Sequence, residues 1–132
     1  EEWPIVPESL TALLIDLTQR YGEALPPIII GENGASFPEP DTVPPGETID
    51  DAERIAYLSG HISAVADAVA AGVDVEEYTV WSLIDNFEWA EGWSSRFGLI
   101  AVDPATQART PRPSAGVYAA ICRANGATAR EA

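Results

Sequence analysis

Residues 81–89 read Trp-Ser-Leu-Ile-Asp-Asn-Phe-Glu-Trp, an apolar run that ends in acids, an amide and aromatic rings. The run from Tyr78 to Ile84 is typical of a buried strand, and the polar groups after it are typical of a pocket rim. Indole faces stack on the C–H face of a sugar ring, and a carboxylate accepts two hydrogen bonds from its hydroxyl groups. Three of the four tryptophans lie within thirteen residues here, so the stretch favours a sugar site over the alternative of a tryptophan-rich core.

The composition is that of one acidic globular domain. The chain has 132 residues, of which 46% are hydrophobic and 21% are charged. These are ordinary values for such a domain. A formal net charge of −14 argues against binding to nucleic acid or to an anionic membrane, so we expect a neutral or cationic partner. No apolar run approaches the roughly 20 residues that span a bilayer, and no export signal opens the chain.

The chain contains one cysteine, one histidine and no methionine. A single cysteine excludes an internal disulfide, and we expect Cys122 to be a buried structural thiol. We expect His61 to be structural as well, and we predict neither a metal site nor a cofactor. An acidic chain without disulfides or a signal fits the cytoplasm. Because position 1 is not methionine, we expect the chain to be a piece of something longer.

Hydrophobic spacing predicts helices and strands in alternation. A helix with apolar positions three and four apart precedes the short apolar strand Ile28–Ile30, which ends in Gly31-Glu32-Asn33-Gly34. A long proline-rich loop follows, and then a second helix capped by Asp50 or Asp51. The remaining predicted elements are a strand over 75–84, a short strand within 97–102 and a last helix over 114–123.

Alternating strands and helices predict an α/β fold with a parallel sheet and right-handed crossovers. Parallel strands end at the same edge of the sheet, and such folds bind their ligands there. We therefore expect the acidic stretches after the two main strands to meet at this edge. This arrangement would bring Glu32 near Glu88.

Two motifs carry a family resemblance. Residues 27–34, Pro-Ile-Ile-Ile-Gly-Glu-Asn-Gly, resemble the nucleophile motif of glycoside hydrolase family 1, usually Ile/Val-Thr-Glu-Asn-Gly. Residues 81–93 and Arg96-Phe97-Gly98 resemble the sugar-binding segment of that family, and the similarity continues through 109–111 to the last helix. Two long motifs in the right order, about fifty residues apart, are more specific than one short motif.

The resemblance implies a particular fold. Family members are (β/α)₈ barrels, which typically need about 250 residues. The chain therefore looks like the C-terminal third of such a catalytic domain, with residues 1–132 supplying about units 7 and 8. Two parallel strands cannot close a barrel, so we expect a missing N-terminal barrel segment, or another copy of the chain, as the partner.

The resemblance also implies an activity, which is retaining hydrolysis of terminal β-D-glucosyl residues in a β-glucoside or small oligosaccharide. By this resemblance Glu32 would be the nucleophile that forms the glycosyl-enzyme intermediate. Glu88 would accept hydrogen bonds from the outer hydroxyl groups of the sugar, and Trp81 would be its stacking platform. The other residues implied by the family pattern are one that helps to hold the site, Asn33, and two that complete the sugar pocket, Trp89 and Phe97.

Some features depart from the family pattern. The family's acid/base glutamate lies in an Asn-Glu-Pro motif, which this sequence does not contain. Gly31 replaces the usual threonine, Glu76-Glu77 stands where Arg-Gly is usual, and Thr79 stands where an aromatic residue is usual. The chain alone is therefore expected to be inactive. The alternative is a catalytically silent fragment that acts as a sugar-binding or assembly module.

Overall fold

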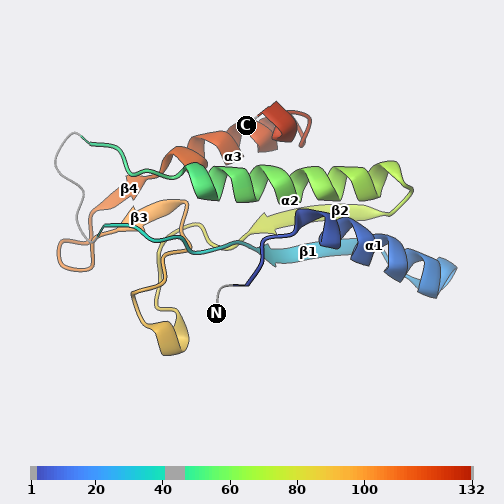
Figure 1. The fold of residues 1–132 in the computed structure, drawn as a ribbon, viewed down its shortest axis with the longest axis horizontal. Coiled ribbons are helices and arrows are strands. Elements are labelled where there is room, and N and C mark those ends of the chain that lie inside the picture. Colours follow the sequence, from blue (N-terminus) through green and yellow to red (C-terminus); the bar gives the residue numbers. More distant parts are fainter. Residues whose placement is uncertain (1–2, 41–46, 132) are drawn as a thin grey trace.

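The computed structural model describes residues 3–40 and 47–131. In this part of the chain, α-helices alternate with short strands (Figure 1). The longer elements are α1 (Pro7–Tyr21), β1 (Ile28–Asn33), α2 (Ala52–Ala70), β2 (Val75–Val80) and α3 (Pro113–Arg123). The shorter ones are η1 (Gly22–Ala24), η2 (Trp89–Glu91), β3 (Ile100–Val102), β4 (Arg109–Pro111) and η3 (Ala129–Glu131).

The two main strands pair in parallel, as the alternation of elements predicted. β1 and β2 form one two-stranded sheet with α2 as the connection between them, and β3 and β4 form a second, antiparallel pair. Parallel strands need such a crossover, because a tight turn can only reverse the chain. The carboxyl ends of β1 and β2 therefore lie at the same edge of the sheet.

The helices cover one face of the β1–β2 sheet. Leu14 of α1 and Val65 of α2 are buried in one apolar cluster, and Ile28 and Ile30 of β1 pack against it. A second cluster buries side chains of α2 and α3 against Tyr78 and Val80 of β2, and its members are Leu58, Ile62, Leu99, Ile121 and Ala129. On the opposite face Ile29 stays 57% exposed, so this face is not covered by the described residues.

Each of the two strands contains one bulge, and the first of them lies in β2. Ile28 pairs with Val75 but Ile29 pairs with Glu77, so β2 has one extra residue at this point. In such a bulge the extra residue is left out of the ladder and the strand bends locally. Glu76 and Glu77 are exposed, and Thr79 Oγ1 donates to Glu77 Oε1 at 3.0 Å. Glu77 thus has a hydroxyl partner within this chain.

Several expected boundaries need correction. The strand expected over 75–84 ends at Val80: Trp81 still donates its backbone N–H to Asn33 of β1, but Ser82 pairs its backbone with Phe97 and Leu99 instead. Strand β4 was not expected from the sequence at all. Cys122 is exposed rather than buried, because α3 turns its neighbour Ile121 into the core. His61 is buried and stacked on Tyr57 with ring centroids 3.9 Å apart, which confirms the structural role expected of it.

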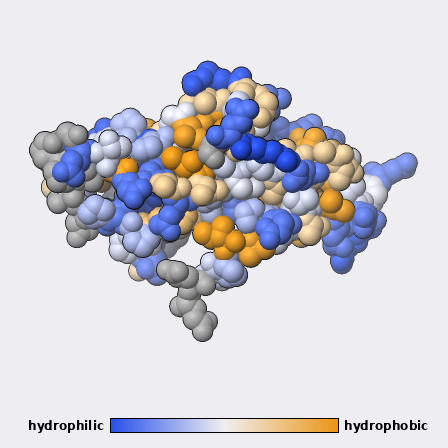
Figure 2. Space-filling model, turned by 45° about the horizontal axis from the view of Figure 1, so that its top comes forward, coloured by the Kyte–Doolittle hydropathy of each residue, from blue (hydrophilic) through white to orange (hydrophobic). Residues whose placement is uncertain are grey.

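The surface carries apolar side chains in several separate patches on the face shown in Figure 2. Exposed large apolar side chains are spread over α1, β1 and the segment that follows β2. Among residues 3–40 and 47–131, no helix is both long enough and apolar enough to cross a lipid bilayer.

Candidate active site at the carboxyl edge of the sheet

The bulge at the end of β1 presents Glu32 to the uncovered face. Ile30 pairs with Tyr78 but Asn33 pairs with Val80, so β1 has one extra residue between these two positions. Ile30 packs into the core, and Asn33 Oδ1 accepts a hydrogen bond from the core residue Tyr78 at 2.6 Å. Both therefore lie on the helix side. The bulge leaves Glu32 exposed between them, as bulges beside active sites commonly do.

Trp81 lies directly beside the motif that contains Glu32. Its backbone N–H donates to the carbonyl oxygen of Asn33 at 2.9 Å. A Cβ atom on Gly34 would lie 1.7 Å from the carbonyl oxygen of Trp81, so only glycine permits this approach of the two backbones. The two sequence motifs, separated by about fifty residues, thus meet at one point of the structure.

Asn33 turns its side chain into the interior rather than toward the uncovered face. Below it lies a group of tyrosines from three elements, Tyr57 of α2, Tyr78 of β2 and Tyr118 of α3. Burial raises the pKa of Tyr57, an effect that the Asn33 side chain partly offsets, and burial also raises the pKa of Tyr78. Both phenols therefore stay protonated and can donate hydrogen bonds. This arrangement supports the backbone next to Glu32 from beneath.

Residues 82–98 form a long segment whose two ends are closed on each other. Ser82 N–H donates to the Phe97 carbonyl at 3.2 Å, and Leu99 N–H donates to the Ser82 carbonyl at 2.9 Å. The Phe97 backbone therefore lies beside Ser82, the residue that follows Trp81. We call these paired ends the root of the segment.

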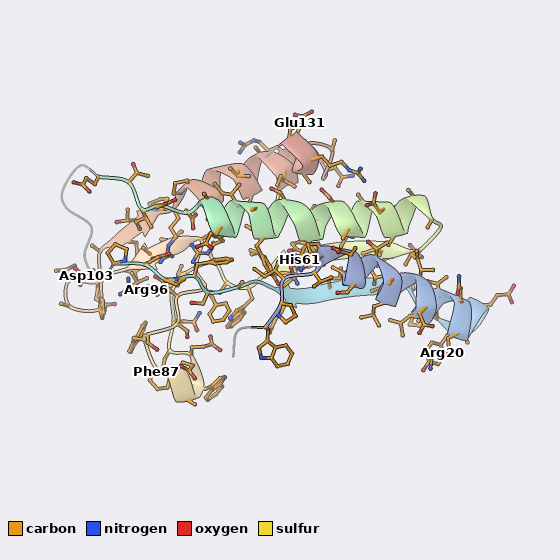
Figure 3. The ribbon with its side chains drawn as sticks, viewed as in Figure 1. Arg20, His61, Phe87, Arg96, Asp103 and Glu131 are labelled. Atoms are coloured by element: carbon orange, nitrogen blue, oxygen red, sulfur yellow. The ribbon has the colours of Figure 1, made fainter. Side chains whose placement is uncertain are left out.

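The far end of this segment, its tip, projects away from the body of the molecule (Figures 1 and 3). Glu88 and Gly92 pair there through their backbones, with Glu88 N–H donating to the Gly92 carbonyl at 2.7 Å. The rings of Phe87 and Trp93 meet edge to face at 6.3 Å. Trp89 is 84% exposed, so it contacts little of the described chain. The structure thus places Trp81 beside the strand that carries Glu32 and Phe97 beside Ser82, and it leaves Glu88 and Trp89 on the projecting tip.

Asp85 joins the root to the start of α3. Its buried carboxylate accepts hydrogen bonds from Arg112, from Nη1 at 3.0 Å and from Nη2 at 2.9 Å. It also accepts from the Gly98 N–H at 2.9 Å and from the Val102 N–H at 3.3 Å. Arg112 in turn donates to the Gly98 carbonyl at 2.6 Å. One guanidinium and one carboxylate therefore bind both ends of the segment.

Glu39 extends these contacts to the loop after β1. Its Oε2 accepts from Arg112 Nη2 at 2.7 Å, and its Oε1 accepts from both Nη atoms of Arg54 at 3.2 Å. Arg54 also pairs with Asp51, which in turn accepts from the Ser114 N–H at 2.9 Å. Asp51 therefore uses its side chain in this network and makes no side-chain cap bond at the start of α2.

Arg96, half-buried and labelled in Figure 3, completes the group. Its Nη1 lies 3.9 Å from Glu39 and donates to the Pro40 carbonyl at 2.8 Å, and its backbone carbonyl accepts from Arg54. Six residues make up this charged cluster: Glu39, Asp51, Arg54, Asp85, Arg96 and Arg112. Burial by itself would lower the pKa of Arg112, but hydrogen bonds and charge from Asp85 and Glu39 raise it. Its guanidinium stays charged.

Sequence reasoning did not find this charged cluster. Its members come from five separate places in the sequence, and each looks like an ordinary surface charge when read alone. One signal was available, because the chain has only seven basic residues and three of them occupy the cluster. The described part of the chain contains no group of His, Cys, Asp and Glu side chains placed to hold a metal ion.

A sequence profile of glycosyl hydrolase family 1 matches residues 1–127, and the chain belongs to this family. Beta-glucosidase A of Enterobacter agglomerans is 45% identical over 117 residues, which are 89% of this chain and 24% of that relative. Beta-glucosidase A of Thermotoga maritima is 42% identical over 124 residues, 94% of this chain and 27% of the relative. The chain thus spans about a quarter of the length of these relatives.

Solved structures agree with the sequence match. A family 1 β-glucosidase from Thermotoga maritima, in complex with isofagomine lactam, superposes with a TM-score of 0.86 at 40% identity. That alignment covers 94% of this chain and 27% of that chain. The β-glucosidase BglU of Micrococcus antarcticus gives a TM-score of 0.86 at 48% identity, over 93% of this chain and 26% of that chain. The predicted fold, an incomplete portion of a (β/α)₈ barrel, is thereby confirmed.

Proposed function

We propose that the chain supplies the nucleophile half of the active site of a retaining β-glucosidase. The observation that carries this proposal is the bulge at the end of β1, which leaves Glu32 exposed on the uncovered face beside Trp81. Because the backbone of Trp81 binds that of Asn33, the Glu32 carboxylate can lie under the anomeric carbon of a sugar stacked on the Trp81 ring. The names of the relatives, which are β-glucosidases, support a β-glucoside as the substrate.

The proposed reaction has two displacements. A carboxylate oxygen of Glu32 forms a bond to the anomeric carbon, while the bond from that carbon to the leaving oxygen breaks. The leaving oxygen takes a proton from a second carboxylic acid, which then removes a proton from water as the water displaces Glu32. The second acid must lie about 5–5.5 Å from the first. We propose that a partner segment completing the barrel supplies it, in a cytoplasmic enzyme.

Glu88, Trp89 and Phe97 are proposed to form the sugar pocket with Trp81. Glu88 and Trp89 lie on the projecting tip, where a further segment of the barrel can reach them. Asn33 is proposed to act from below, because its side chain binds Tyr78 rather than facing the open side. A β-glucoside or short oligosaccharide is the proposed substrate.

Covalent trapping tests the proposal directly. The chain replaces the matching segment of Thermotoga maritima β-glucosidase A, and the folded chimera is incubated with a 2-fluoro-β-glucoside that carries an activated leaving group. We expect a stable adduct on the peptide that contains Glu32, found by intact mass and peptide mapping. A folded chimera that turns over β-glucosides but carries its adduct elsewhere would contradict the assignment of Glu32.

Two variants sharpen this experiment. Glu32→Gln keeps the size of the side chain and removes the nucleophilic charge, so we expect no adduct and a fall in kcat of about a thousandfold or more. Glu23→Gln makes the same change in η1, at the other end of β1, and we expect full trapping. Sugar binding by the folded chimera without any turnover would favour the silent sugar-binding module instead.

A further inference from the structure

The root of residues 82–98 is held by direct backbone contact and by one guanidinium. A Cβ atom on Gly98 would lie 2.3 Å from the backbone nitrogen of Asp85, so the two ends of the segment touch there. Arg112 donates to both of these residues, and its side chain is 0% exposed. A planar guanidinium that binds a carboxylate through two nitrogens fixes direction as well as distance.

The tip depends on this root for its orientation. Trp89, Phe87 and Trp93 are 84%, 58% and 49% exposed, and the backbone bonds of Glu88 stay within the tip. Glu88 lies only three residues after Asp85 in the sequence. A small rotation at Asp85 would therefore move the Glu88 carboxylate relative to β1.

The same guanidinium also reaches the other half of the proposed site. Arg112 Nη2 donates to Glu39, which lies in the loop that follows Glu32. Arg112, at the start of α3, thus binds both the segment that follows Glu32 and the segment that follows Trp81. The distance between the nucleophile and the sugar-binding segment is then set by the charged cluster.

Stability alone accounts poorly for such a cluster. A buried ion pair contributes little net stability compared with apolar side chains of similar size, because removing the charges from water costs about as much as their attraction gains. Three of the chain's seven cations nevertheless lie here against three carboxylates. Apolar side chains could not reproduce the fixed geometry of a guanidinium that binds a carboxylate through two nitrogens.

We infer that Arg112 is a positioning residue for the sugar-binding segment, which acts through Asp85 to place the Glu88 carboxylate against the sugar. This inference rests on the proposed function. It concerns a residue that itself touches no substrate, and it predicts an energetic coupling between Arg112 and Glu88.

A double-mutant cycle in the chimera measures this coupling. Arg112→Lys keeps the charge but loses the two-pronged bond to Asp85, and we expect kcat/KM for an aryl β-glucoside to fall on the order of tenfold to a hundredfold. When Arg112→Lys is made in the Glu88→Gln variant, kcat/KM should fall by no more than about twofold, because the carboxylate that Arg112 positions is already absent. Arg130→Lys, in an exposed pair with Asp67, is the matched control and should leave kcat/KM unchanged.

The experiment distinguishes failure of this inference from failure of the proposed function. Equal losses from Arg112→Lys in both backgrounds, or no loss in either, would overturn the inference and leave the proposed function intact. A folded, unsubstituted chimera without β-glucosidase activity would instead overturn the proposed function. If Arg112→Lys does not fold, Asp85→Asn is placed in the same cycle, where it should show the same coupling to Glu88.

Discussion

At the residue scale, the site depends on two positions where backbones approach so closely that a side chain cannot fit. Gly34 meets the carbonyl of Trp81, and Gly98 meets the backbone of Asp85. Gly34 follows the proposed nucleophile Glu32 by two positions, and Gly98 follows the proposed pocket residue Phe97 by one. Glycine is needed at both positions because there is no room for a side chain. Neither Gly34 nor Gly98 has a positive φ, so neither is needed for its backbone conformation. The approach is what allows Glu32 and Trp81 to share one edge of the sheet.

Alanine substitutions at two glycines should act in opposite directions. Gly34→Ala drives a methyl group into the Trp81 carbonyl, so we expect the free energy of unfolding to fall by about 1–3 kcal/mol. Gly116 lies inside α3, and a methyl group there would meet no atom within 4 Å apart from its neighbours in the same helix. Gly116→Ala should therefore raise the free energy of unfolding by about 0.5–1 kcal/mol. Urea unfolding of both variants checks this. A neutral Gly34→Ala would mean that the two motifs are not in contact in solution.

At the element scale, the three tyrosines between the sheet and the helices connect β2 with α2 and α3. Tyr118 of α3 donates through its hydroxyl group to the Tyr78 carbonyl at 3.2 Å. Burial, with a smaller contribution from the nearby Cys122, raises the pKa of Tyr118 to about 12. The hydroxyl groups of Tyr78 and Tyr118 donate hydrogen bonds in the layer between the sheet and the helices, so their protonated form is part of the packing.

These raised pKa values predict a loss of stability at high pH. A phenol with a raised pKa keeps its proton in the folded chain while the unfolded chain ionises near pH 10. Its contribution is therefore complete below pH 10 and declines as the pH rises through 10 toward 12. We expect the free energy of unfolding to be lower at about pH 11 than at about pH 8.

Tyr118→Phe is the control for this pH dependence. The variant lacks one of the titrating phenols, so its free energy of unfolding should fall less steeply over the same pH range, although the lost hydrogen bond lowers its stability at neutral pH. Urea unfolding at both pH values gives the two slopes. Identical slopes for the variant and the unsubstituted chain would contradict a raised pKa for Tyr118.

At the scale of the whole molecule, helices cover one face of the β1–β2 sheet, while among residues 3–40 and 47–131 nothing pairs with its two outer edges or covers Ile29 on the other face. Unpaired strand edges and exposed apolar side chains favour association with another chain. The net charge of −14 opposes association of identical copies, and salt screens this repulsion. We therefore expect the chain to associate more strongly as the salt concentration rises.

Sedimentation at increasing salt concentration, with two matched variants, tests which face is responsible. Ile29→Lys places a charge on the uncovered face of β1 and should reduce association. Leu13→Lys makes a similar change on α1, where the leucine is 52% exposed, and should reduce it less. A larger effect of Leu13→Lys would place the contact on the helix side instead.

Much of the fold was predictable because it depends on local patterns. Apolar spacing placed all three α-helices of the described residues, and their alternation with strands predicted the parallel pair. The end of β2 at Val80 and the short strand β4 were missed, since both depend on backbone pairing with distant residues. Cys122 was misplaced because adjacent helical positions differ in burial according to the rotation of α3, which local sequence only partly defines.

The sequence by itself determined the family, and it named the candidate nucleophile and the side chains proposed to bind a sugar, because these are properties of motifs. Tertiary structure alone decided how Glu32 reaches the open face, since this needs a bulge whose register involves both strands. It also decided that Asp85 and Arg112, twenty-seven positions apart, bind each other at the root of the proposed sugar-binding segment. Which charged residues pair across such a sequence separation depends on how the chain packs, so local sequence patterns do not predict it.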